Sequence, residues 1–307
     1  MDFSIVITTR NRKKELLKCV ESVKKSRLDD LAWELIVVDD FSSDGTEALH
    51  ASDLNVANGK IIHNPSQQML VRSRNIGARR SKGKYILFID DDNVVAPEMI
   101  FNILDFTKRH KKVGIAGPSM YYQDTREKSM DFQKINLFTG KTNFLFCQTE
   151  KEFCRSDGLP NAFLVKQEVF EKAGYFDESL IQTFTEPDFA LRAKKIGYDC
   201  TVVVKAKIFH NISRAKKFEP DSLGGNFPQK AYCVMRNRTV FVCRYGNLLQ
   251  KFSYILFFSW LWPLLYSMIV LRRKRIDLVK IYWRGWLDGV IYFFTGRLIN
   301  SLPKLLK

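Results

Sequence analysis

The 307-residue sequence contains six cysteines but no Cys-x-x-Cys pair, and its four histidines form no cluster. This pattern argues against a structural zinc site, because such sites need closely spaced thiolate and imidazole ligands. Scattered cysteines are typical of a reducing compartment, so we expect all six to be free thiols. They stand at positions 19, 147, 154, 200, 233 and 243.

Glycine is missing from the first apolar segment and the residues after it, VITTRNRKK. A nucleotidyltransferase that makes nucleotide sugars would need a glycine-rich phosphate loop near this point. The missing glycine argues against this class of enzyme, which we keep as a second candidate. We expect no signal peptide, because the sequence begins directly with the strand-like run FSIVITT. We therefore expect a protein that stays on the cytoplasmic side of the membrane.

Positive charge is concentrated in the last third of the chain. Residues 205–307 hold 19 Lys and Arg against 4 Asp and Glu, which accounts for +15 of the formal net charge of +16. Such a block indicates a polyanionic partner, either nucleic acid or an anionic membrane surface, unless it only confers solubility. A nucleic-acid-binding protein would need exposed aromatic residues between the charges. Here the aromatic residues lie in long apolar runs, which favours the membrane and argues against nucleic acid.

The first 210 residues alternate apolar runs with helical patterns. Strands are predicted at 3–9, 34–40, 60–64, 85–90 and 201–210, with a basic helix before residue 85, one opened by Pro97 and one opened by Pro187. Continuous apolar strands separated by helices predict an α/β fold with a Rossmann-like, mostly parallel sheet flanked by helices. Ligands of such sheets bind beyond the carboxyl ends of the strands, where Thr8–Arg12, Asp39–Asp40 and Asp90–Asp92 fall.

Residues 252–271 carry no charge and are long enough to span a bilayer, which needs about 20 residues. However, basic residues flank both ends of this run, which conflicts with a single crossing under the positive-inside rule. The following segment mixes Trp and Tyr with Arg, as helices at membrane interfaces do. We interpret residues 252–307 as a surface-embedded or re-entrant helical hairpin. A true span and a helical pair packed on the rest of the chain or in a homodimer are the alternatives.

The triplet Asp90–Asp92 after the strand YILFID is the sharpest chemical signal. Adjacent carboxylates repel one another by roughly 4 kcal/mol per pair at 4 Å and an effective dielectric of about 20, so a cation should compensate them. If the strand geometry continued, Asp90 and Asp92 would share one face and Asp91 the other. Two oxygen donors on one face suit Mn²⁺ or Mg²⁺. The alternative is an acidic strand end that caps the next helix.

Two further clusters are candidates for donor binding. Asp39 and Asp40 end a strand, where a carboxylate can accept from a ribose hydroxyl or a base, although a capping or turn role fits equally. Arg74 and Asn75 belong to the basic helix that leads to the acidic strand. A guanidinium there can bind a diphosphate bidentately, while most of its basic neighbours form a solvated face.

In order and spacing, the segments VITTRNR, VVDDFSSDGT, RNIGARRSKGKYILFIDDDN, GYFDE and TEPDFALR resemble the inverting glycosyltransferase family 2. The resemblance covers about residues 3–210. It implies a GT-A fold that binds a nucleotide-diphosphate sugar with Mn²⁺ or Mg²⁺ and transfers the sugar in a single displacement. The Gln-x-x-Arg-Trp signature of processive synthases is missing, which favours the addition of one sugar at a time.

The resemblance also implies roles for single residues. Thr9 and Asp39 would line the nucleoside. Asp90 and Asp92 would form the metal motif, and His210 would complete the metal ligands. Glu186 would be the general base that deprotonates the acceptor hydroxyl, with Asp188 as the alternative, because only one acid of the family's usual pair precedes Asp188. The full predicted donor site consists of Thr8, Thr9, Arg10, Arg12, Asp39, Asp40, Arg74, Asn75, Asp90 and Asp91.

The expected organisation has three parts. Residues 1–215 form the catalytic domain, with a donor half at about 1–119 and an acceptor half at about 120–215. Residues 216–251 connect it to the hydrophobic and basic helices of 252–307. The predicted protein is a glycosyltransferase that works at an anionic membrane surface on a lipid-linked or glycan acceptor, and its C-terminal helices are a possible homodimer contact.

Overall fold

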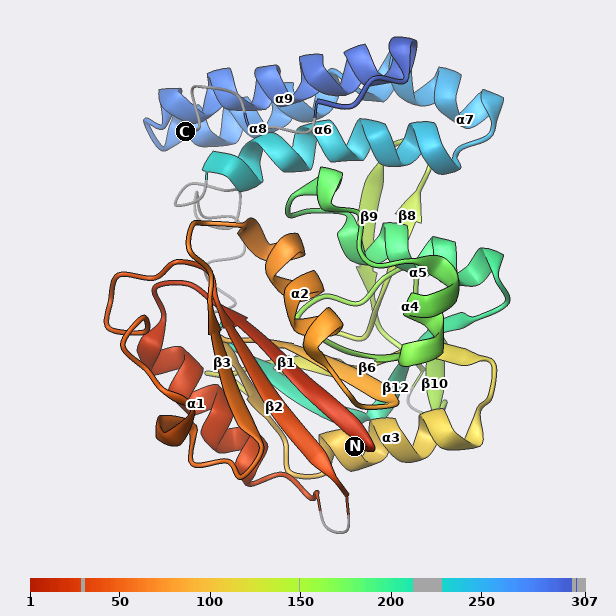
Figure 1. Ribbon diagram of the computed structural model, residues 1–307. Helices are drawn as coiled ribbons and strands as arrows, with labels where there is room; N and C mark the ends of the chain where they lie inside the picture. The colour runs from red at the N-terminus through yellow and green to blue at the C-terminus, as the bar shows by residue number, and fades with distance from the viewer. Residues whose placement is uncertain (29–30, 149, 212–227, 300–301, 303–307) are drawn as a thin grey trace. The chain divides into compact units, whose positions relative to one another are not determined.

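The computed structural model describes the chain except for residues 29–30, 149, 212–227, 300–301 and 303–307 (Figure 1). It divides into two compact units. Unit 1 comprises residues 1–134, 144–176 and 186–213, and unit 2 comprises 135–143, 177–185 and 214–307.

The strands are β1 Phe3–Thr9, β2 Trp33–Asp39, β3 Gly59–His63, β4 Tyr85–Asp90, β5 Asn93–Val95, β6 Val113–Tyr122, β7 Lys128–Met130, β8 Phe132–Asn136, β9 Lys141–Leu145, β10 Phe153–Arg155, β11 Ala162–Lys166 and β12 Asp199–His210. The α-helices are α1 Lys13–Lys24, α2 Met69–Arg80, α3 Met99–Arg109, α4 Gln167–Ala173, α5 Thr185–Lys195, α6 Pro228–Tyr245, α7 Leu248–Ser253, α8 Leu261–Arg272 and α9 Ile276–Thr295. Shorter helical turns are η1 Ala51–Leu54, η2 Glu178–Leu180 and η4 Tyr254–Phe258.

Unit 1 is built on one large mixed sheet with the strand order β10-β12-β6-β11-β4-β1-β2-β3. Strands β3, β2, β1 and β4 run parallel, as their continuous apolar sequences predict. β11 was not predicted. It lies antiparallel between β4 and β6, and its Ala-Phe-Leu-Val run is completely buried. The predicted α/β class with a mostly parallel sheet is confirmed.

Helices cover both faces of this sheet (Figure 1). On one face, α1 and α3 pack on the side chains of Phe3, Ile5 and Ile7, and on the other face α2, α4 and α5 pack on Val6 and neighbouring strands. A Cβ added to Gly77 of α2 would lie 2.3 Å from Cγ1 of Val6. Only glycine therefore allows α2 to approach β1 this closely, and α2 carries Arg74 to the tip of the sheet.

Unit 2 is mainly helical. α6 packs along α9, and α8 also packs on α9 (Figure 1). Of the predicted connecting segment 216–251, residues 216–227 lie outside the described residues, and α6 belongs to unit 2 with the C-terminal helices. The continuous helical stretch Leu248–Arg272 is apolar and long enough to cross a membrane, with 28% of its most apolar window buried.

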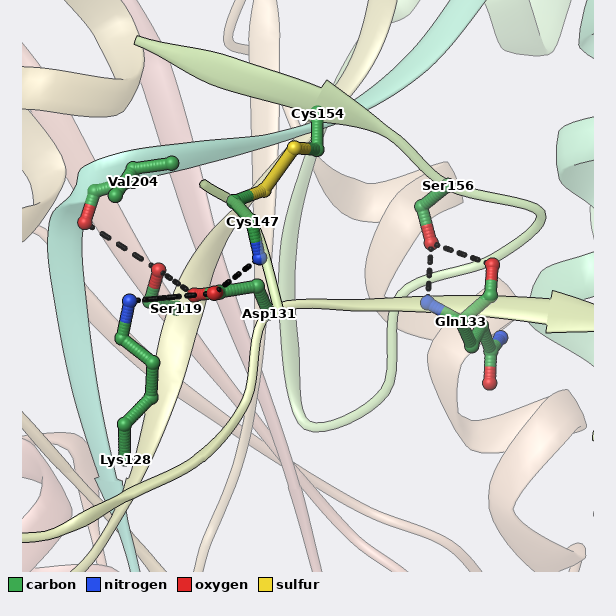
Figure 2. Close-up of a disulfide and its surroundings, with 8 residues drawn as sticks. All are labelled: Ser119, Lys128, Asp131, Gln133, Cys147, Cys154, Ser156 and Val204. Carbon is green, nitrogen blue, oxygen red and sulfur yellow. Dashed lines mark hydrogen bonds and ion pairs between the residues drawn. A yellow bond between two sulfur atoms is a disulfide. The ribbon is translucent and has the colours of Figure 1, made fainter. Parts of the chain in front are cut away.

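Cys147 and Cys154 form a disulfide (Figure 2), so the expectation of six free thiols is wrong for this pair. Their side chains meet because β10 returns beside the segment that follows β9. The backbone N–H of Cys147 also donates to buried Asp131, at 2.8 Å, and the Lys128 ammonium pairs with the same carboxylate. The four other cysteines are free.

Candidate functional site

The polar ends of β1, β2 and β4 meet at one edge of the sheet. In the strand register Thr9 lies beside Asp39, and Thr8 lies beside Asp90. Thr8, Thr9 and Asp39 are buried. The parallel strands thus bring three segments that are distant in sequence to one place, as predicted from the apolar runs that precede them.

The acidic triplet divides between two guanidinium groups. Asp90 accepts from Nη2 of Arg74 at 2.6 Å. Asp91 and Asp92 share Nη1 of Arg12, at 3.0 and 2.9 Å. The expectation that Asp91 points away from Asp92 is wrong, because β4 ends at Asp90 and the alternation of a strand stops there. Arginine side chains therefore supply the compensating charge within the chain.

The three carboxyl groups differ in acidity. Burial raises the pKa of Asp91 to about 7, although the charge of Arg12 opposes the shift. Burial also raises the pKa of Asp90. For Asp92 burial is outweighed by the hydrogen bonds and charges of His210 and Arg12, which lower its pKa. Asp92 is therefore the most readily ionised member of the triplet and the best candidate for a cation ligand.

His210 is positioned by β5, a short strand that was not predicted from the sequence. β5 pairs antiparallel with β12, and in this register Asn93 lies beside His210. Nε2 of His210 consequently lies 3.5 Å from Oδ1 of Asp92. Asn93 donates to the carbonyl of Asp90 at 3.0 Å, while its own buried Oδ1 accepts no hydrogen bond from the residues that the structure describes. The asparagine that directly follows the triplet in FIDDDN was the sequence feature that could have indicated this part of the site.

Asp92 and His210 fit a divalent cation as a two-residue ligand set. Among the residues that the structure describes, no group of three or more His, Cys, Asp and Glu side chains is placed to hold a metal. Mg²⁺ and similar ions commonly take one or two protein ligands and complete their coordination with substrate phosphates and water. Asp90, the other predicted ligand, instead pairs with Arg74.

Arg74 joins the acidic strand end to the predicted base. Its guanidinium is buried and makes ion pairs with both Asp90 and Glu186. Burial alone would lower the pKa of Arg74, but these two carboxylates raise it, so the group remains charged. Glu186 keeps 17% of its side chain exposed, so an acceptor can reach it from solvent.

Asp188, the alternative base, is paired with an arginine of its own helix. It is 1% exposed and accepts from Nε of Arg192 at 2.9 Å. Arg192 also donates to the carbonyls of Ala173 and Tyr175. Helix α5 begins at Thr185, two residues before the predicted start at Pro187, so Glu186 and Pro187 both lie in its first turn.

The two acids at the end of β2, Asp39 and Asp40, have separate partners. Asp39 lies 2.9 Å from Nδ1 of His63. Both oxygens of Asp40 accept from the first turn of α2, from the N–H groups of Gln68 and Met69 at 2.6 and 2.9 Å. Asp40 therefore caps the helix that carries Arg74, in line with the capping alternative.

Two other predicted donor residues also differ in their surroundings. The Asn75 amide is buried and exchanges hydrogen bonds with the backbone of Phe176, at 2.9 and 3.1 Å, which holds α2 against that segment. Arg10 follows β1, and its buried Nε has no hydrogen-bond partner within the described ranges. Of the two, Arg10 has the nitrogen that remains available to a ligand.

Comparison with known proteins identifies the family of this chain. The sequence model of Glycosyl transferase family 2 matches residues 4–174, which is more than half of the chain. The chain is 25% identical over 197 residues to glycosyltransferase GlyG of Streptococcus pneumoniae, covering 63% of this chain and 57% of that protein. It is 26% identical over 229 residues to the poly(ribitol-phosphate) β-N-acetylglucosaminyltransferase TarS of Staphylococcus aureus, covering 70% of this chain and 39% of TarS. The chain thus spans little more than half the length of GlyG and well under half that of TarS.

Solved structures share the fold. TarS residues 1–349 of S. aureus, in complex with UDP-GlcNAc, superimposes with a TM-score of 0.60 at 16% identity, covering 95% of this chain and 81% of that one. GalNAc-T7 with UDP, GalNAc and Mn²⁺ gives a TM-score of 0.61 at 16% identity, covering 82% and 54%. The predicted GT-A fold is confirmed.

Proposed function

Because the chain belongs to glycosyl transferase family 2, we propose that it transfers one sugar from a nucleotide-diphosphate sugar to an acceptor hydroxyl, with inversion at the anomeric carbon. The observation that carries this proposal is the approach of Glu186 to the Asp90–Asp92 triplet through Arg74. A base and a cation-binding carboxylate at one sheet edge are what a single displacement requires. Family membership favours this function over nucleotidyl transfer and over nucleic-acid binding.

Glu186 is the residue that we propose as general base. Its carboxylate is partly exposed, whereas that of Asp188 is buried and paired with Arg192. Glu186 would accept the proton of the acceptor hydroxyl as its oxygen attacks the sugar. Arg74 holds the Glu186 carboxylate in place through their ion pair.

The donor would lie over the ends of β1, β2 and β4. We propose that Thr9 and Asp39 bind the nucleoside, and that Arg10 and Arg12 contribute positive charge. Asp92 and His210 would hold Mn²⁺ or Mg²⁺, which when bound offsets charge on the departing diphosphate. Both superimposed structures were solved with UDP or a UDP-sugar, so UDP is the first nucleotide to test.

The test is a screen of UDP-, GDP- and dTDP-sugars for hydrolysis and transfer. With the active donor, Glu186→Gln should retain donor affinity and lose about 10² to 10⁴-fold in transfer rate, the usual contribution of general-base catalysis. Glu171→Gln, an exposed acid on α4, is the matched control and should behave like the parent. Near-normal transfer by the Glu186 variant would move the base to another residue.

We also propose that unit 2 binds an anionic membrane surface and so brings the enzyme to a lipid-linked or membrane-proximal glycan acceptor. Large apolar side chains are exposed along α7, η4 and α8, including Leu256, Phe257 and Trp260. Apolar patches of this kind mark interaction sites, and the basic residues 272–275 adjoin the patch. A homodimer through the same helices is the alternative.

Vesicle flotation tests this proposal. Deleting the chain after Gly246 is unsuitable, because α6 would lose α9, its main packing partner within unit 2. Substituting exposed residues avoids this problem. Leu256→Glu with Phe257→Glu should abolish flotation with anionic vesicles, whereas Phe146→Glu, an equally exposed site in unit 1, should not. Unchanged flotation of the double variant would contradict membrane binding by this face.

The side of the membrane is a separate proposal. We propose the cytoplasmic face, and the Cys147–Cys154 disulfide is the feature that argues against it, because structural disulfides are rare in the cytosol. Alkylation of thiols in intact cells, followed by mass spectrometry of the purified protein, decides the matter. Alkylated Cys147 and Cys154 would support the cytoplasmic face, and an unreactive pair would contradict it.

A further inference from the structure

Helix α6 buries an arginine, Arg238, two of whose nitrogens find no acceptor among the described residues. Arg238 is 5% exposed, and no residue outside the undescribed segments forms a hydrogen bond with its Nε or Nη1. Within the described part of the chain, no Asp or Glu forms an ion pair with it. Buried charges in proteins are normally paired, because removing an ion from water is costly.

Aromatic side chains hold this guanidinium in a fixed position. Its carbon lies 4.0 Å from the ring centroid of Trp262 and 5.7 Å from that of Tyr266, both on α8. The Trp262 indole donates to the carbonyl of Thr139 at 2.6 Å, which fixes the ring. The stem of Arg238 passes Gly140 so closely that an added Cβ would lie 2.8 Å from its Cγ. Cation–π contacts recover only part of the desolvation cost.

Arg236, two residues earlier on the same helix, shows what a structural arginine looks like here. It is fully buried, and its nitrogens donate to the carbonyls of Ile299 and Ser179 and to the Asn237 side chain, at 2.7, 2.6 and 2.9 Å. These hydrogen bonds link α6 to other segments of unit 2, and this structural role explains why Arg236 is buried. It does not explain Arg238, because neither Nε nor Nη1 of its guanidinium has a hydrogen-bond partner in the described part of the chain.

We propose that Arg238 binds the phosphate group of a lipid. A planar guanidinium matches phosphate oxygens bidentately, and the two rings shield the pair from water. Leu264, Leu265 and Met268 of the same α8 are exposed and would contact the acyl or prenyl chain. The inference deepens the proposed membrane association and rests on it for the source of the ligand.

The first test uses the full chain and vesicles of phosphatidylcholine with a minor fraction of phosphatidic acid. Arg238→Gln should weaken binding by about tenfold or more, since hydrogen bonds to a charged group are lost, and the loss should persist at high salt. Arg273→Gln removes the same charge from an exposed site and should cost at most about fivefold, an effect that salt removes. Equal effects of the two substitutions would overturn the site.

The second test needs no membrane. Short-chain, soluble phosphatidic acid should raise the thermal midpoint of the parent chain and leave that of Arg238→Gln unchanged. Without ligand, Arg238→Met should melt at the parent's temperature or higher, because an unpaired buried charge has been removed. A large fall in the midpoint would show that Arg238 is structural and overturn the proposal. If inorganic phosphate stabilised the parent as well as the lipid did, the anion site would be supported and the lipid assignment overturned.

Failure of this inference is distinguishable from failure of the proposed function. UDP binding and donor hydrolysis should be the same for Arg238→Gln and the parent, because Arg238 has no part in the donor site. A parent chain that ignores vesicles but binds the short-chain lipid would contradict membrane association and retain the phosphate site. A parent chain that floats with vesicles but is not stabilised by the short-chain lipid would support membrane association and contradict the phosphate site.

Discussion

Replacing Arg74 with methionine should destabilise unit 1 strongly. The substitution keeps an unbranched side chain on α2 but leaves Asp90 and Glu186 facing each other without their shared cation. Breaking a buried ion pair from one side costs about 3–5 kcal/mol. We expect a value of about 3 kcal/mol, because Asp90 and Glu186 retain 26% and 17% side-chain exposure and water can partly solvate them.

A second substitution tests the cause of this loss. Adding Glu186→Gln to Arg74→Met removes one of the two repelling charges and should restore about 1 kcal/mol, a coupling expected for residues in contact. In the parent background, Glu186→Gln should instead be destabilising, because it removes a partner of Arg74. Arg80→Met, an exposed arginine on the same helix, is the control and should change stability by no more than about 0.5 kcal/mol.

Amide hydrogen exchange of β1 and β4 is the appropriate assay, because it reports the opening of unit 1 without a contribution from unit 2. The free energies should rank parent and Arg80→Met highest, the double variant next and Arg74→Met lowest. If Arg74→Met lost less than about 1 kcal/mol, or if the added Glu186→Gln restored nothing, Arg74 would not be the group that neutralises both carboxylates.

Three further outcomes are expected. Asp92→Ala should abolish the Mn²⁺-dependent part of UDP binding in calorimetry, while exchange of the β4 amides stays at the parent level; unchanged binding would remove Asp92 from the metal site. Asp40→Asn should destabilise the chain by about 1 kcal/mol, because an amide has one acceptor oxygen for the two N–H groups at the start of α2, and UDP affinity should not change; a selective loss of UDP affinity would contradict the capping role. Burial opposes the ionisation of Asp177, but hydrogen bonds from Ser179 and Arg244 lower its pKa below the ordinary value. The stability that this carboxylate contributes is therefore present above about pH 4 and lost as the pH falls through its lowered pKa, so the stability difference between parent and Asp177→Asn should vanish in acid melts.

The sequence alone determined the parallel half of the sheet. β1 and β4 have the predicted bounds, and β2 and β3 differ by one residue at each end, because buried parallel strands are continuous apolar runs that end abruptly in polar residues. Since parallel strands end at the same edge, the crowding of Thr9, Asp39 and Asp90 followed directly. No strand was predicted at β11, because an apolar run this short shows no periodicity that distinguishes a strand from a buried helical segment.

Tertiary structure alone decided which side chains face each other. Sequence patterns do not specify that Arg74 reaches Glu186, 112 residues away, or that the three-residue β5 turns His210 toward Asp92. Asp39 and Asp40 are adjacent in sequence, yet only Asp40 lies where the free N–H groups of α2 begin. In unit 2 the same holds for Arg236 and Arg238, which are two residues apart on one helix. Their different roles arise because neighbouring backbone carbonyls reach the first guanidinium, whereas aromatic rings pack over the second.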